Sequence, residues 1–282
     1  MAPQNNLLTD DATFTRYAMN LIDHTLYGRI DAARDAERMM IANLAIQLLN
    51  RERADPGNAN SDILSFFGFC HRNIARSHAQ ILQDLWVLYM LAERQDGYFV
   101  EFGACDGKLL SNTMLLEEAY RWQGILAEPN RHWHGELRAN RRAIISHKCV
   151  AASSGDEIEF MATDKRPELS RVASIVPDDV HERNGNRAEY SLYKVETTSL
   201  VDLLKAHDAP EVIDYLSIDT EGSEYDILRA FDFDSYRFRL ITVEHAGEKE
   251  KREQIRELLE AKGYNRWLPI LTRWDDWYIG EV

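Results

Sequence analysis

Hydrophobic and polar positions follow two different periods along this chain, and the change falls near Gly97. Before Gly97, apolar residues return every three or four positions, which predicts amphipathic helices. These helical runs are 12–27, 36–51 and 77–93. The last run opens with Ser77 and has Gln80 three residues on, a capping-box pattern. We therefore predict a helical segment over residues 1–95 that packs on the rest, pairs subunits or covers a substrate.

After Gly97, short apolar runs alternate with helical ones. Strands are predicted at 98–102, 124–128, 143–150, 156–160, 212–219 and 238–245. Helices are predicted at 112–121, 130–140 (capped by Asn130), 199–206 (capped by Ser199), 223–231 and 248–262, with Gly263 ending the last one. Two closing strands, 264–270 and 274–280, are too close for a crossover helix and should be antiparallel. This pattern predicts an α/β fold over residues 96–282, a Rossmann-like doubly wound sheet that is mostly parallel with an antiparallel C-terminal strand.

Several features remain open between two interpretations. The polar segment 163–194 has no clear element and is either a binding loop or a disordered insertion. The tryptophans at 267, 274 and 277 either pack in the core or stack on sugar rings. His132 and His134 lie on a predicted helix at a spacing that points their rings apart, so we expect them on the surface.

Composition narrows the classes of partner. The chain has 47 acidic and 33 basic residues and a net charge of −14, which argues against nucleic acid as the main partner. Its three cysteines show no disulfide or zinc pattern, and we see neither a signal peptide nor a membrane span. We expect a soluble cytoplasmic protein, with a possible homo-oligomer formed through the helices of 12–51.

A glycine-rich turn follows the first predicted strand, in the sequence EFGACDG at 101–107. Gly103 and Gly107 allow a ligand to approach the backbone closely. The next strand ends at Glu128, where a carboxylate can accept both hydroxyls of a ribose. Together these features predict a nucleoside site at the carboxyl end of the sheet.

Charge indicates which nucleoside this site takes. Glu101 and Asp106 would repel a pyrophosphate, but they suit a cofactor that carries an ammonium and a sulfonium, which is S-adenosylmethionine. The alternatives are a nicotinamide-dependent dehydrogenase and a non-catalytic protein that acts as an interaction module through residues 1–95.

Acidic residues also end the fourth and fifth predicted strands. Asp219, Glu244 and His245 can converge there, either around a divalent cation or as a source of a general base. Glu221 and Glu224 can instead cap the following helix, where carboxylates are favourable.

From about Ser77 onward, the chain resembles the FkbM family of S-adenosylmethionine-dependent O-methyltransferases. The matching segments, in the family's order, are QDLWVLY (83–89), VEFGACDGKLLSNT (100–113), GILAEPN (124–130) and LSIDTEGSEYDIL (216–228). The resemblance implies methyl transfer to a hydroxyl, often on a sugar of a glycan or glycosylated small molecule. The implied cofactor contacts are Glu101, Gly103, Asp106, Asn112 and Glu128. We extend them to the neighbouring Ala104, Gly107, Pro129, Val150, Ala151 and Asp219.

The resemblance also bears on metal and base. Relatives that use magnesium draw ligands from strands four and five, which here means Asp219, Glu244 and His245. Some metal-dependent O-methyltransferases have a basic residue three positions after the strand-four acid, where this chain has Gly222. The metal and the base therefore stay open at this point, with His245 as the first candidate base, Glu221 as the second and Asp219 beside them.

Overall fold

The computed structural model describes residues 60–176, 178–269, 272 and 274–281. The chain divides into two compact units, Met1–Arg72 and Asn73–Val282. In the first unit, the described element is helix α3 (Asn60–Asn73). The predicted helices at 12–27 and 36–51, and the oligomer contact assigned to them, lie outside the described residues. Across the described part of the chain, every helix is too short or too polar to span a bilayer.

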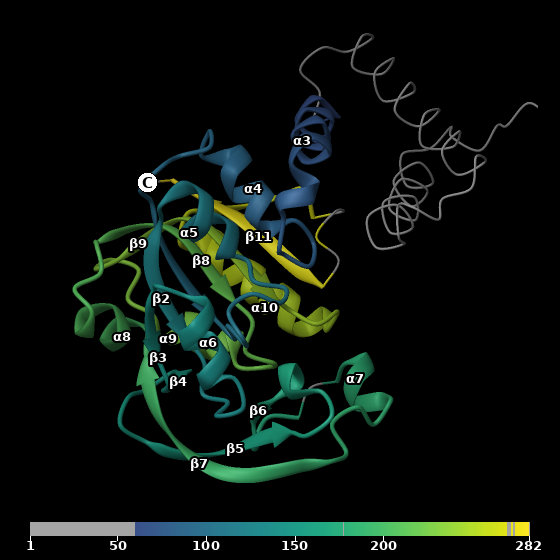
Figure 1. Cartoon of the computed structure of the whole chain (residues 1–282), viewed down its shortest axis with the longest axis vertical. Helices are drawn as coiled ribbons and strands as arrows, with labels where there is room; N and C mark the ends of the chain where they lie inside the picture. The colour runs from purple at the N-terminus through teal and green to yellow at the C-terminus, as the bar shows by residue number, and fades with distance from the viewer. Residues whose placement is uncertain (1–59, 177, 270–271, 273, 282) are drawn as a thin grey trace, which may run out of the picture. The chain divides into compact units, whose positions relative to one another are not determined.

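The second unit is built on a seven-stranded sheet (Figure 1). Its strands are β1 (Tyr98–Phe102), β2 (Gln123–Ala127), β3 (Ile144–Ser146), β8 (Val212–Ile218), β9 (Arg237–Glu244), β10 (Tyr264–Trp267) and β11 (Asp275–Gly280). They lie in the order β10-β11-β9-β8-β1-β2-β3. β1 pairs in parallel with β2 and β8, whereas β11 is antiparallel to β9 and β10. The predicted fold class and antiparallel ending are confirmed.

The strand order places a switch point between β1 and β8, because the chain leaves β1 in one direction and returns on its other side at β8. Ligands of doubly wound sheets bind beyond the carboxyl ends of the strands at such a point. The turns after β1, β2, β8 and β9 therefore meet where the sequence predicted the site.

Helices cover both faces of this sheet. Helices α8 (Leu200–Ala206), α9 (Glu224–Ala230) and α10 (Lys249–Ala261) share one apolar core with alternate strand residues. Helices α4 (Gln83–Met90), α5 (Met114–Tyr120) and α6 (His134–Asn140) lie on the other face. There, the fully buried Trp86 of α4 lies 5.0 Å from the buried Trp277 ring of β11, and Trp267 stacks parallel to Trp277 at 5.9 Å. Trp277 is thus a core residue.

Two helices begin later than predicted. α4 begins at Gln83, after Leu82 in a left-handed conformation, and the Ser77 hydroxyl donates to Asp84 (2.6 Å) instead of capping a helix. α6 begins at His134, because the Asn130 side chain is used in a tighter turn, where it accepts the His132 N–H at 3.0 Å. By contrast, the predicted Ser199 cap and the left-handed Gly263 are present.

The segment between β3 and β8 forms a second sheet, so the absence of clear elements predicted for 163–194 is wrong. Its strands are β4 (Cys149–Ala151), β5 (Glu157–Thr163), β6 (Arg171–Val172) and β7 (Tyr190–Ser199), in the order β4-β7-β5-β6. The short helices η4 (Pro167–Leu169) and α7 (Val180–Arg183) lie between β5 and β7. The predicted strand 143–150 is therefore two strands in two sheets. Figure 1 shows this sheet and α7 beyond one end of the main sheet.

Candidate cofactor and acceptor site

The turn after β1 is shaped by Gly103. Its backbone is left-handed (φ 73°), and a Cβ there would lie 2.0 Å from the Asp219 carbonyl oxygen. No other residue tolerates such an approach, so glycine lets the ends of β1 and β8 come together. The close approach seen here is that of the neighbouring strand, and the predicted approach of a ligand to this turn stays a prediction.

Glu128 lies directly after β2 and is 4% exposed. One carboxylate oxygen accepts the Cys105 N–H (2.9 Å), and the other accepts the Asn130 N–H (2.7 Å). Burial raises the pKa of this carboxyl to about 7. A carboxylate can accept about four hydrogen bonds, so the two backbone bonds fix its direction and leave capacity for two ribose hydroxyls.

Glu101 and Asp106 are engaged by their own loop. Glu101 is buried and accepts from the Asn112 N–H (2.8 Å) and the Thr113 hydroxyl (2.5 Å), with the Arg141 guanidinium 3.6 Å away. Asp106 accepts two backbone N–H groups two and three residues further on, at 2.8 and 2.7 Å. Both carboxylates therefore shape the turn, and the charge argument for a cationic cofactor rests on other acids of the site.

Asn112 offers a further polar group. Its amide nitrogen donates to the Ser217 hydroxyl of β8 at 2.8 Å. Its side-chain oxygen is buried and has no hydrogen-bond partner among the described residues. Because buried polar atoms are normally paired, this oxygen fits a donor from a bound molecule such as the ammonium of S-adenosylmethionine.

The other predicted cofactor contacts are spread around this turn. Ala104 is buried beside Gly103, and Gly107 is left-handed (φ 78°) with Arg141 Cγ 2.5 Å from the place of a Cβ. Pro129 is half-buried between Glu128 and Asn130. Val150 is part of the main apolar core, and Ala151 of the same strand, β4, is half-buried. Their cofactor contacts stay predictions.

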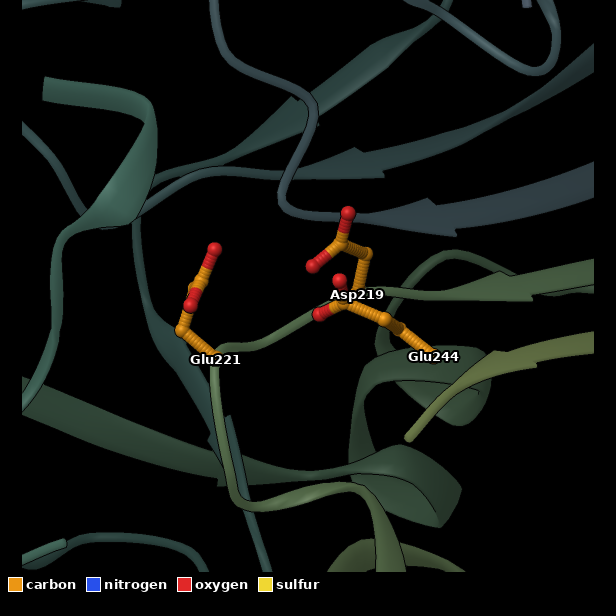
Figure 2. Close-up of side chains that lie close together, drawn as sticks. All are labelled: Asp219, Glu221 and Glu244. Carbon is orange, nitrogen blue, oxygen red and sulfur yellow. The ribbon is translucent and has the colours of Figure 1, made fainter. Parts of the chain in front are cut away.

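Three carboxylates gather at the ends of β8 and β9. One ligand oxygen from each of Asp219, Glu221 and Glu244 lies within 4.8 Å of the other two. Figure 2 shows Asp219 and Glu244 side by side, with Glu221 projecting from the loop after β8. The sequence predicted Asp219 and Glu244 together, but it placed Glu221 only as a possible cap or base.

The pKa values of this carboxylate cluster are raised. Burial, more than the neighbouring charges, raises the pKa of Asp219 to about 6 and that of Glu221 to about 8. Burial and the charge of Asp219 raise the pKa of Glu244 well above its ordinary value. One oxygen of Glu244 is buried without a hydrogen-bond partner among the described residues. Glu244 therefore lacks a donor for one of its two oxygens.

Two cations, Arg187 and Lys251, lie near the carboxylate cluster, and each pairs with more than one acid. Arg187, from the segment between α7 and β7, donates to Glu221. Lys251 of α10 lies 3.3 Å from Glu224, which also accepts the backbone N–H groups of Thr220 and Gly222 at 3.0 Å each. Glu224 thus holds the loop after β8. It does not cap α9 through a side-chain hydrogen bond, so the predicted helix cap is absent. Arg187 was missed, because its segment shows no periodicity that would place it.

The structure does not bring His245 to the carboxylate cluster. Its Nδ1 accepts the Gly247 N–H (3.0 Å) and its Nε2 donates to the Asp275 carbonyl oxygen (3.1 Å). Burial lowers its pKa to about 4. With both ring nitrogens engaged, this neutral imidazole has no free lone pair for a metal or a proton. His245 points away from Glu244, because successive residues along a strand point to opposite sides. The third acid of the cluster is Glu221 instead.

Of the two histidines predicted to lie on the surface near Glu128, His134 differs from the expectation and His132 does not. His134 is half-buried, with its ring stacked at 3.6 Å on His147 and its Nε2 3.0 Å from the Glu128 carbonyl oxygen. His132 is exposed, as predicted.

The fold and the site define a class of protein. A mostly parallel sheet with an antiparallel seventh strand, a glycine turn after its first strand and an acid after its second are the marks of an S-adenosylmethionine-dependent methyltransferase. The chain belongs to the FkbM methyltransferase family, since the Methyltransferase FkbM domain matches residues 101–266, more than half of its length. The dehydrogenase alternative is thereby rejected, and the cofactor of this class is S-adenosylmethionine.

Solved structures resemble the chain only distantly. Precorrin-6y C5,15-methyltransferase from Geobacter metallireducens GS-15 is 15% identical, with a TM-score of 0.36 over 65% of this chain and 71% of that one. The N-terminal domain of human METTL16 is 14% identical, with a TM-score of 0.36 over 69% and 66% of the two chains. Human methyltransferase 10 domain containing protein is 11% identical, with a TM-score of 0.35 over 70% and 78%. Among curated proteins, none matches the sequence significantly. These similarities do not bear on the substrate.

Proposed function

We propose that this methyltransferase transfers its methyl group to a hydroxyl, carried by a sugar of a glycan or of a glycosylated metabolite. The observation that carries the proposal is the carboxylate cluster of Asp219, Glu221 and Glu244, beside the Gly103 turn. Nitrogen and thiolate acceptors are nucleophiles without much help, whereas a sugar hydroxyl must lose its proton. A group of carboxylates with raised pKa values suits that task.

On the cofactor side, the residues of the chain hold S-adenosylmethionine and orient it. S-adenosylmethionine supplies a methyl group already activated by its sulfonium. Glu128 accepts the ribose hydroxyls, and the Asn112 oxygen accepts from the ammonium. Holding the acceptor oxygen in line with the methyl group at about 3 Å can supply roughly 7–11 kcal/mol of the barrier.

On the acceptor side, Glu221 takes the hydroxyl proton. Its pKa of about 8 lies near neutrality, where a general base works best, and contributes on the order of 10²–10⁴ in rate. Asp219 and Glu244 hydrogen-bond to one another and so share a proton in the absence of a cation.

The same residues suit a divalent cation such as Mg²⁺. Asp219 and Glu244 offer the oxygen donors that a hard cation prefers, and Glu244 has an unpartnered oxygen, while Glu221 keeps its role as the base. A cation there would balance the surplus negative charge and lower the pKa of a bound hydroxyl.

The test begins with S-adenosylhomocysteine in a calorimeter. Binding at micromolar to millimolar concentration is expected, and no heat at millimolar concentration would refute the cofactor site. The protein and methyl-labelled S-adenosylmethionine are then incubated with the glycan and glycolipid fraction of the source cells. The fraction is hydrolysed and examined by mass spectrometry. O-methylated sugars support the proposal, whereas label on nitrogen, carbon or sulfur contradicts it. Full activity in excess EDTA would show that the reaction requires no divalent cation.

A further inference from the structure

Arg187 is the most buried cation near the carboxylate cluster, and it comes from the second sheet's segment. Its side chain is 2% exposed. Its Nε donates to the Leu169 carbonyl oxygen (3.1 Å), and its two terminal nitrogens donate to both oxygens of Asp179 at 2.9 and 2.8 Å. One of those nitrogens also donates to Glu221. Every direction of the guanidinium is thus fixed by the segment or by Glu221.

Asp179 is itself held in place. It caps the start of α7, where its carboxylate accepts the Glu182 N–H at 2.7 Å, and its side chain is 1% exposed. A bidentate arginine–carboxylate pair with both members buried is strong and directional. Arg187 and Asp179 therefore form one rigid unit that presents a guanidinium to the loop after β8.

That loop is shaped to meet the segment. Glu221 has a left-handed backbone (φ 57°), which costs a residue with a side chain on the order of 1 kcal/mol or more. Gly222 follows with φ 129°, and a Cβ there would lie 2.5 Å from Ile175 Cγ2. One ionic contact and one steric contact thus join the segment to two adjacent residues of the site.

We propose that Arg187 is a positioning residue, which holds Glu221 in its strained conformation so that the carboxylate faces the acceptor. The segment 171–187 thereby becomes part of the acceptor half of the site, because its folding sets the place of Glu221. This inference rests on the proposed function in assigning Glu221 to the acceptor. Arg187 acts through Glu221 and needs no contact with the cofactor.

The test compares Arg187→Met and Arg187→Lys with Arg183→Met, a matched control. Arg183 lies in the same segment and pairs with Asp178 at 2.8 Å, but both side chains are exposed. The first readout needs no acceptor: amide hydrogen exchange in the peptide that covers 219–224. We expect faster exchange in Arg187→Met, partial protection in Arg187→Lys and no change in Arg183→Met. Unchanged exchange in Arg187→Met would overturn the inference.

The second readout is a double-mutant cycle with Glu221→Gln. Arg187→Met is expected to lower kcat at least about tenfold, with affinity for S-adenosylhomocysteine within about twofold of wild type. In the Glu221→Gln background, Arg187→Met should cost nothing further, because both changes remove the same group. Additive losses, or a parallel loss of S-adenosylhomocysteine affinity, would overturn the inference. If the acceptor proves not to be a hydroxyl, the proposed function fails, and the exchange experiment still decides the role of Arg187.

Discussion

The acids of the cofactor turn and the acids of the carboxylate cluster are the same residue types in opposite situations. Around the turn, Glu101, Asp106 and Glu128 each accept at least two hydrogen bonds from backbone or hydroxyl groups. At the ends of β8 and β9, Asp219 and Glu244 mainly face each other, and Glu244 keeps an unpartnered oxygen. Carboxylates that the protein itself bonds hold the local structure, whereas those with an unpartnered oxygen retain the capacity to bind a cation or a proton.

The largest effect is expected for a substitution in the carboxylate cluster, at Glu221. Glu221→Gln keeps the shape of the side chain and removes its basicity, so kcat should fall by about 10²–10⁴. Affinity for S-adenosylhomocysteine, measured by calorimetry, should stay near wild type. A variant with unchanged kcat would place the base elsewhere. The exposed Glu250→Gln on α10 is the control, and it should leave both quantities unchanged.

Glu128→Ala tests the acid that bonds both to the backbone and, as proposed, to the ribose. Its main effect should be on the binding of S-adenosylhomocysteine. Two charged hydrogen bonds to ribose hydroxyls are lost, so affinity for S-adenosylhomocysteine should weaken by about 100-fold or more. Titration calorimetry against the exposed α6 control Glu136→Ala checks this. Affinity within about threefold of wild type would show that Glu128 does not hold the ribose.

Glu101→Gln tests whether a fully bonded acid is structural. The amide can accept some of the same bonds, but its NH₂ group would face the Arg141 guanidinium and the Thr113 hydroxyl. We expect a loss of about 1–3 kcal/mol in the free energy of unfolding. Chemical denaturation measures it. At temperatures where the variant is folded, affinity for S-adenosylhomocysteine should change little, and a selective loss of affinity would instead make Glu101 a cofactor ligand.

The positions of these acids at the ends of the strands could be predicted from the sequence. Strand ends were readable because apolar runs in a buried parallel sheet stop abruptly at Gly103, Glu128, Asp219 and Glu244. These positions meet because parallel strands share one carboxyl edge. What could not be read was which acids are already bonded, because Ser111, Thr113 and Arg141 satisfy Glu101 through a loop and a helix end that have no periodic signal.

His245 and Arg187 are two further residues whose roles could not be predicted from the sequence. His245 was preferred because histidine usually titrates near neutrality, yet backbone groups of Gly247 and Asp275 use both of its nitrogens. Arg187 was one of several arginines in a polar segment, and only the fold of β5, β6 and α7 selects it. Ring orientation and loop closure depend on tertiary contacts, and the linear pattern does not encode them locally.

The smallest expected effect is a pH dependence of the affinity for S-adenosylhomocysteine, set by Glu128. Ribose hydroxyls donate to the ionised carboxylate, and burial raises its pKa to about 7. Affinity should therefore be highest above pH 7 and fall as the pH drops, by at most about tenfold per pH unit. Calorimetry between pH 5.5 and 8.5 measures it, with Glu128→Gln as the variant whose profile should be flatter.

Stability should respond in the opposite direction, which separates this effect from acid unfolding. A carboxyl whose pKa is raised by folding holds its proton more tightly in the folded protein. Its contribution to the free energy of unfolding is therefore largest below the ordinary pKa of 4.5 and is lost as the pH rises through about 7. As the pH rises from 5 to 7, the ligand-free wild type should thus lose stability relative to Glu128→Gln. Over the same range, the increase in Tm caused by S-adenosylhomocysteine should grow. A Tm gain that is constant across this range would mean that the ribose does not bond to this carboxylate. Glu128 would then be an acid whose shown role, like that of Glu101 and Asp106, is to bond groups of the chain itself.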